Sequence, residues 1–240
     1  MSRIYQKFAL VVPTLNEAEN IILVLNRVIT ALSRLQVPWE ILVVDDESND
    51  GTPEIVRRYA ESESRVRLLE RSSQRGLAGA ITHGWSYSDA DLIGVIDADL
   101  QHPPELLPKL INRVCNGFDI AIASRYLEPR SIDDWSPARK ALSRLSVLAS
   151  VPVQKPTRRV KDPLSGFFVL RHECIAGVHF QETGFKLLLE VLAKGHINSV
   201  TEIPFKFATR HRGTSKAGAM TAFYYFWLLC KLSREAFFGR

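Results

Sequence analysis

Apolar runs and helical repeats alternate along the first half of the chain. Short, mostly apolar stretches predict strands at 8–12, 40–44, 65–70, 92–96 and 119–123, and the continuous apolar run at 92–96 indicates a buried strand. Between them, apolar residues recur at helical spacing, as they do at Ile21, Leu25, Val28, Ile29 and Leu32. This alternation predicts an α/β protein with a mostly parallel central sheet flanked by helices.

The second half is less regular. Its pattern predicts helices at 136–149 and 184–195 and strands at 165–170 and 199–207. The end of the chain, from 221 to 240, predicts a helix rich in aromatic residues. Such a helix either packs on the core or lies in a membrane interface, where Trp, Tyr and basic side chains are favoured. We therefore expect one main domain over 1–218 and a separate C-terminal helix over 219–240.

Composition narrows the kinds of partner. The 240 residues carry a net charge of +5, and the sequence pI is near 9.2. This mild excess suits an anionic ligand or an anionic membrane surface, but it lacks the dense basic patch of a nucleic-acid-binding protein. Cys115, Cys174 and Cys230 are widely spaced and odd in number, which is typical of a reduced cytosolic chain. No apolar stretch reaches the roughly 20 residues that span a bilayer.

Polar residues gather where the predicted strands end. In doubly wound sheets, ligands bind beyond the carboxyl ends of the strands. The residues that follow these ends are Pro13, Glu17, Asp46, Asp97, Asp99 and Arg125. We therefore expect a single crevice to collect their side chains.

The sequence "VIDADLQHPPE", residues 95–105, places two carboxylates one residue apart. Alternate residues of an extended chain point to the same side, so Asp97 and Asp99 can converge on one cation. Mg²⁺ and Mn²⁺ prefer such oxygen ligands and leave positions for phosphate oxygens. The alternative is a solvated acidic turn that caps the following helix. We interpret the adjoining His102 as a surface residue or a supporting residue behind the site, and not as a ligand.

Other motifs indicate how a phosphorylated ligand would be held. In "VDDES" the residues after Asp45 form a turn, so Asp46 alone is assigned to a nucleobase edge or a ribose hydroxyl. The sequence has no P-loop, and no GxGxxG follows its first strand, so phosphate binding falls to a metal and to basic side chains. The candidate cations are Arg125, Arg139, Arg210 and Lys216. For any one of them, the alternative is a solvated surface charge.

Eight motifs occur in a fixed order: "VVPTLNEAENI", "VVDDESNDGT", "GLAGAITHGW", "DADLQHPPE", "ASRY", "DPLSGFF", "GFKLLLE" and "RGTSK". Together they resemble the inverting GT-A glycosyltransferases of family 2, and within it the dolichol-phosphate (polyprenol-phosphate) mannosyltransferases. The similarity runs from about Phe8 to Lys216, and "DADLQHPPE" and "RGTSK" are its most specific parts. The resemblance implies a GT-A, Rossmann-like catalytic domain, a nucleotide-sugar donor, a polyprenyl or dolichyl phosphate acceptor, and Mg²⁺ or Mn²⁺.

The resemblance also implies roles for individual residues. Those expected to bind the donor are Pro13, Glu17, Val44, Asp46, Asp97, Ala98, Asp99, Gln101, Arg125, Lys186, Arg210 and Lys216. Among these, Asp97, Asp99 and Gln101 form the metal and diphosphate motif. Arg139 and Ser143 match residues that meet the acceptor phosphate, and they join Asp99 and Arg125 as the expected catalytic residues.

Two features depart from the family's pattern. Leu15 stands where the family has a tyrosine beside the nucleobase, so a UDP-sugar such as UDP-glucose is an alternative donor to GDP-mannose. Many relatives continue into transmembrane helices, and none is predicted here. We expect a peripheral protein on the cytosolic face of a membrane, recruited directly or by a membrane-anchoring partner protein. A non-catalytic nucleotide-sugar-binding relative is a third alternative, which the intact acidic and basic motifs disfavour.

Overall fold

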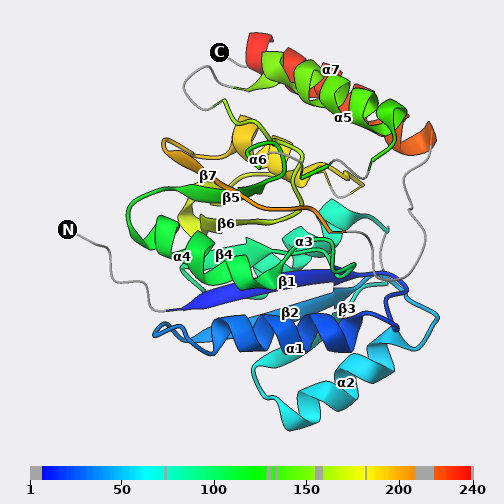
Figure 1. Cartoon of the computed structure of the whole chain (residues 1–240), viewed down its shortest axis with the longest axis vertical. Helices are drawn as coiled ribbons and strands as arrows, with labels where there is room; N and C mark the ends of the chain where they lie inside the picture. Colours follow the sequence, from blue (N-terminus) through cyan, green and yellow to red (C-terminus); the bar gives the residue numbers. More distant parts are fainter. Residues whose placement is uncertain are drawn as a thin grey trace.

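A seven-stranded sheet runs through the molecule (Figure 1). The computed structural model describes residues 7–72, 75–128, 131–132, 135–154, 159–181, 183–208 and 219–238. The strands are β1 (Phe8–Thr14), β2 (Trp39–Asp45), β3 (Val66–Glu70), β4 (Leu92–Val95), β5 (Ile120–Ser124), β6 (Phe168–Arg171) and β7 (Val200–Pro204). Their order in the sheet is β3-β2-β1-β4-β6-β5-β7. Only β6 runs antiparallel to its neighbours, so the prediction of a mostly parallel sheet is confirmed.

Helices cover both faces of the sheet. The α-helices of the described chain are α1 (Ile21–Leu32), α2 (Thr52–Ser62), α3 (Leu77–Ser86), α4 (Leu107–Cys115), α5 (Pro137–Ser150), α6 (Leu187–Lys194) and α7 (Ala219–Phe238). One core cluster joins the sheet to α1, α2 and α4, and a second joins it to α3 and α6. β1 and β2 are buried along their full length because both faces are covered, which explains their continuous apolar runs.

Small residues let helix α3 lie close to the sheet. A Cβ added at Gly84 would lie only 2.7 Å from Cγ2 of Val11 in β1. The close approach places the beginning of α3 beside the carboxyl ends of β1 and β2. It therefore brings the helix to the edge of the sheet where the sequence predicts the crevice.

Helices α5 and α7 lie side by side at one end of the molecule, away from α1 and α2 (Figure 1). Leu228 and Leu232 of α7 pack against Leu189 of α6. The hydroxyl of Tyr225 donates a hydrogen bond to the carbonyl oxygen of Ser146 in α5, at 2.5 Å. Burial raises the pKa of Tyr225 to about 12, so this hydroxyl remains protonated at neutral pH. One face of the C-terminal helix therefore packs on the protein.

Candidate functional site

A cleft of about 500 Å³ opens at the carboxyl ends of β1, β2 and β4. Its lining residues are Pro13, Thr14, Leu15, Glu17, Asp46, Arg75, Gly76, Leu77, Ala80, Asp97, Ala98, Asp99 and Phe185. Six of the residues that the sequence assigns to the donor are in this set: Pro13, Glu17, Asp46, Asp97, Ala98 and Asp99. The crevice rule thus places the acidic motifs in one site, as predicted.

The loop after β4 carries both carboxylates of the acidic pair into the cleft. The Asp97 side chain is about one-third exposed, at 31%. Asp99 is buried, and its Oδ1 accepts a hydrogen bond from the backbone nitrogen of Gln101 at 3.1 Å. A Cβ at Gly166 would collide with Oδ2 of Asp97, so the glycine of "SGFF" leaves room for that carboxylate. The described residues contain no group of three or more His, Cys, Asp and Glu side chains arranged to hold a metal ion.

Strained backbone is concentrated in the loops that line the cleft. Asn16, Glu47 and Leu100 have φ angles of 55°, 62° and 61°, and they are the non-glycine residues with positive φ in the described chain. They lie in the loops after β1, β2 and β4, respectively. A leucine in this left-handed region is an outlier, and such conformations persist where the surrounding structure imposes them, often at functional sites.

Asp46 is held in a fixed orientation. Its Oδ1 accepts a hydrogen bond from Nη1 of Arg71 at 2.7 Å, and its Oδ2 accepts one from the backbone nitrogen of Gly76 at 2.7 Å. The neighbouring Asp45 instead accepts from the hydroxyls of Thr14 and Ser48. The two aspartates therefore divide as the sequence suggests, because Asp45 stabilises the turn and Asp46 faces the cleft.

Sequence reasoning missed several residues of the cleft. Arg75, which lines the cleft, and Arg71, which holds the lining residue Asp46, both follow β3, and the same crevice rule applied to that strand would have indicated them. Arg75 is exposed and contacts Glu47 twice: its Nε lies 3.0 Å from Oε2, and its Nη2 donates to the carbonyl oxygen at 3.0 Å. Phe185 lies in the motif "GFKLLLE", in which the resemblance assigned only the adjoining Lys186 to the donor. The place of Phe185 in the cleft depends on how that motif packs.

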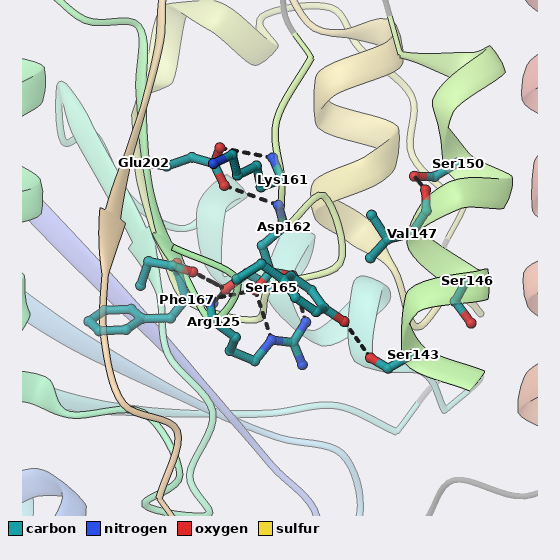
Figure 2. Close-up of polar contacts among 12 residues, drawn as sticks. Arg125, Ser143, Ser146, Val147, Ser150, Lys161, Asp162, Ser165, Phe167 and Glu202 are labelled. Atoms are coloured by element: carbon teal, nitrogen blue, oxygen red, sulfur yellow. Dashed lines mark hydrogen bonds and ion pairs between the residues drawn. The ribbon is translucent and has the colours of Figure 1, made fainter. Parts of the chain in front are cut away.

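The guanidinium of Arg125 forms an ion pair with the buried carboxylate of Asp162. Its Nε and Nη2 donate to the two carboxylate oxygens of Asp162 at 2.8 and 2.6 Å, and its backbone nitrogen donates to Oδ2 at 2.9 Å (Figure 2). The Asp162 side chain is fully buried. Arg125 is not among the residues that line the cleft in this structure. Its contact with the donor stays a prediction.

His102 lies directly behind the acidic pair. Its ring is buried against Phe167, Phe205 and Phe207, and Nδ1 is 3.6 Å from Oδ2 of Asp97. Burial lowers the pKa of His102 to about 3, and the positive charge of Arg125 adds to the effect, so the imidazole is neutral. Of the two interpretations offered by the sequence, the supporting position is confirmed and the surface position is wrong.

The remaining residues predicted to bind the donor are not among those that line the cleft in the described part of the chain. Gln101 is buried, and its side-chain amide donates to the carbonyl oxygen of Ala208 at 3.2 Å, so its metal role stays a prediction. Val44 is buried in β2 opposite Pro13. Burial lowers the pKa of the Lys186 amine, and repulsion from Arg125 acts in the same direction. Arg210 and Lys216 lie outside the described residues.

The two residues assigned to the acceptor lie on α5. The hydroxyls of Ser143 and Tyr126 are 2.5 Å apart, so a hydrogen bond links α5 to the residue after Arg125 (Figure 2). The guanidinium of Arg139 lies 4.1 Å above the centre of the Trp135 ring. Neither residue is among those that line the cleft.

The sequence is similar to a known protein family and to characterised relatives. The family model described as glycosyl transferase family 2 matches residues 9–179. Dolichol-phosphate mannosyltransferase of Pyrococcus furiosus is 41% identical over 219 residues, which are 91% of this chain and 61% of that protein. The protein of the same name from Saccharomyces cerevisiae is 31% identical over 91% of this chain and 84% of its own length. This chain therefore spans less than two thirds of the archaeal relative.

A solved structure shows the same fold at lower sequence similarity. Glucosyl-3-phosphoglycerate synthase from Mycobacterium tuberculosis, determined with Mn²⁺, UDP-glucose and phosphoglyceric acid, superposes with a TM-score of 0.65. It is 20% identical, and the match covers 95% of this chain and 80% of that one. This likeness concerns the fold, and it agrees with the GT-A fold expected from the motifs.

Proposed function

Because the chain belongs to glycosyl transferase family 2, we propose that it transfers a hexose from a nucleotide sugar to a polyprenyl phosphate, inverting the anomeric carbon. The observation that carries the proposal is the cleft, which collects Asp46 and the Asp97–Asp99 pair around a space suited to a nucleotide sugar. The relatives named dolichol-phosphate mannosyltransferase support a lipid phosphate as the acceptor.

Asp97 and Asp99 are the residues that would hold Mg²⁺ or Mn²⁺. Two carboxylates in the cleft provide oxygen ligands and leave the other positions to diphosphate oxygens, as these ions prefer. The space beside Gly166 keeps the Asp97 carboxylate open to the cleft. When bound, such an ion neutralises the charge of the departing nucleoside diphosphate. The Mn²⁺ in the structural neighbour supports this assignment.

The other cleft residues orient the donor. Arg71 and Gly76 fix the Asp46 carboxylate, so it accepts hydrogen bonds from the nucleobase or ribose in one direction. We propose GDP-mannose as the donor, following the named relatives. Leu15 lines the cleft in place of the family's tyrosine and favours testing UDP-glucose as the alternative. Comparing thermal stabilisation by GDP and UDP, each with Mg²⁺, separates the two.

The acceptor needs little activation. A lipid phosphate is anionic at neutral pH, so its oxygen attacks the anomeric carbon without a strong general base. Catalysis then rests on positioning two anions and neutralising their charge. Arg139 and Ser143 are the proposed acceptor contacts on α5, and Arg210 and Lys216 complete the cationic set in the predicted "RHRGTSK" loop.

A lipid acceptor requires a membrane surface, and α5 is suited to contact one. Leu142, Leu145 and Leu148 point outward with 65%, 61% and 66% of their surface exposed, while the Ser143 hydroxyl and the backbone carbonyl oxygen of Ser146 form hydrogen bonds with tyrosines outside the helix. Arg139 and Arg144 on the same helix would attract anionic lipids. Beside it, α7 exposes Phe226 and Trp227. No helix in the described part of the chain has the length and apolar character needed to cross a bilayer.

We propose that these two helices hold the protein peripherally on the cytosolic face of a membrane. The reaction is tested with a donor screen in which GDP-mannose and UDP-glucose are each offered with a polyprenyl phosphate in detergent and Mg²⁺. A β-linked lipid product from an α-linked donor supports inverting transfer. Metal-dependent nucleotide binding without transfer to any polyprenyl phosphate would instead favour the non-catalytic alternative.

A further inference from the structure

We propose that helix α7 is a positioning element for the donor cleft: Tyr224 and Lys231 brace the segment that presents Phe185 and Lys186 to the donor. This segment comprises residues 183–186, just before α6. The inference rests on the proposed nucleotide-sugar site, and it adds a role for the C-terminal helix that is separate from membrane contact.

The inner side of segment 183–186 forms part of the cleft wall. Phe185 lines the cleft together with Asp97 and Asp99. The carbonyl oxygen of Gly184 accepts a hydrogen bond from the backbone nitrogen of Ala78 at 2.9 Å. Ala78 lies in the first turn of α3, directly after the lining residue Leu77. Any shift of the segment therefore moves Phe185 relative to the acidic pair.

The outer side of the same segment packs against α7. The ring centres of Phe185 and Tyr224 are 6.3 Å apart. A small cavity is enclosed by Gly184, Phe185 and Lys186 on one side and by Tyr224, Tyr225, Trp227 and Leu228 of α7 on the other. Phe185 thus lies between the cleft and the C-terminal helix. The ring of Tyr224 supports it from behind.

A polar network ties the base of the segment to α7. Nζ of Lys231 donates to Oε1 of Gln181 at 3.2 Å, and the backbone nitrogen of Gln181 donates to Oε2 of Glu190 at 3.2 Å. Glu190 is fully buried and pairs with Lys194 at 3.0 Å. Nζ of Lys194 also lies 3.9 Å from a carboxylate oxygen of Glu235 in α7. A buried carboxylate needs its partners, so this network holds the segment in one arrangement.

Loss of the brace should therefore weaken donor binding. A misplacement of about 1 Å in a positioned site costs on the order of a hundredfold in rate, even when the changed residue is far from the chemistry. Tyr224 is not among the residues that line the cleft, and its ring contacts Phe185, while Lys231 reaches the segment through Gln181. Their effect should appear in the affinity for the nucleotide, before any transfer occurs.

The test measures binding of GDP and of UDP, each with Mg²⁺, by titration calorimetry. Tyr224→Ala should weaken binding of the preferred nucleotide about tenfold or more, and Lys231→Ala should weaken it in the same direction. Tyr224→Phe keeps the ring and should bind as the unmodified chain does. Cys230→Ala, an exposed position on the same helix, is the matched control and should leave the affinity unchanged.

Thermal unfolding of each variant shows whether a loss of nucleotide affinity comes from a shift of segment 183–186 or from loss of the folded structure. If Tyr224→Ala does not fold, Lys231→Ala and its conservative partner Lys231→Arg decide the question. Affinities in both alanine variants equal to that of Cys230→Ala would overturn the inference while leaving the proposed function intact. An unmodified chain that binds neither nucleotide would overturn the proposed function, and this inference with it.

Discussion

At the scale of single residues, the position of the Asp97 carboxylate depends on residue 166 being a glycine, which has no side chain. A Cβ at Gly166 would overlap Oδ2 of Asp97, which lies at the mouth of the cleft. The Asp97 carboxylate therefore occupies the space that a side chain at position 166 would need. The position of the proposed metal ligand is set by a residue that offers no ligand atom itself.

Gly166→Ala should displace Asp97 and lower transfer on the order of a hundredfold, because the ligand geometry shifts by an ångström or more. The Kd for Mn²⁺ in the presence of nucleotide should rise in parallel. Both are measured on purified protein, beside its thermal unfolding. Full activity and unchanged Mn²⁺ affinity in a folded Gly166→Ala variant would show that Asp97 does not serve the metal.

The Arg125–Asp162 pair is expected to stabilise the site. Asp162→Ala leaves the Arg125 guanidinium without its buried partner, and breaking such a pair costs about 3–5 kcal/mol of unfolding free energy. Urea unfolding measures the loss. As a control, Glu70→Ala breaks the exposed Arg57–Glu70 pair and should change stability by about 1 kcal/mol or less. Equal losses for the two variants would contradict this account.

Individual site residues were predictable to the extent that local pattern determined them. Asp46, Asp97 and Asp99 follow strand ends, and the fold rule gathers such residues without knowledge of packing. The partner of Arg125 lies 37 residues away, beyond the reach of any local pattern. Phe185 was missed for the same reason, because its place in the cleft is decided by contacts with α3 and α7.

At the scale of elements, helix α5 exposes its large apolar side chains to solvent instead of burying them in the core. Its leucines face outward, and the Ser143 hydroxyl and the backbone carbonyl oxygen of Ser146 each form a hydrogen bond with a tyrosine outside the helix. Apolar patches of this kind on soluble surfaces mark interaction sites. The proposed acceptor residues and the outward leucines share this one helix, so lipid contact and acceptor binding would occur together.

Replacing Leu142, Leu145 and Leu148 with Asn should strongly weaken binding to anionic vesicles that contain polyprenyl phosphate, with α7 as the remaining contact. Thermal stability should change little, because the leucines are exposed in the folded chain. Co-sedimentation with vesicles measures binding. The control variant carries the same Asn replacement at Ile22 and Leu23, which are exposed on α1 at the other end of the molecule (Figure 1). It should bind the vesicles as the unmodified chain does. Undiminished binding by the leucine variant would place the membrane contact elsewhere.

The types of the elements were more predictable than their pairing. Largely apolar runs indicated β1, β2, β4 and β5, because strands covered on both faces need apolar residues throughout, whereas β3 lies at the edge of the sheet and is only partly buried. The reversed direction of β6 between β4 and β5 left no mark on the sequence. Its direction follows from a connection whose path only the folded chain reveals.

At the scale of the whole molecule, the proposed donor site and the proposed membrane contact lie in different parts of the fold. The carboxyl edge of the sheet holds the cleft, and α5 and α7 close the end of the molecule where lipid would approach (Figure 1). The net charge of +5 favours both anionic substrates and an anionic surface. The fold class and the site's location followed from the sequence, whereas the brace between α7 and the cleft required the folded chain.

The central claim is that this cleft transfers a hexose to a polyprenyl phosphate. The most direct measurement incubates radiolabelled GDP-mannose, polyprenyl phosphate and Mg²⁺ with the unmodified chain or with Asp99→Asn, and counts label extracted into organic solvent. We predict lipid-linked label that requires the acceptor and falls about a hundredfold or more in Asp99→Asn. No lipid-linked label from GDP-mannose or from UDP-glucose, or full transfer by Asp99→Asn, would contradict the account.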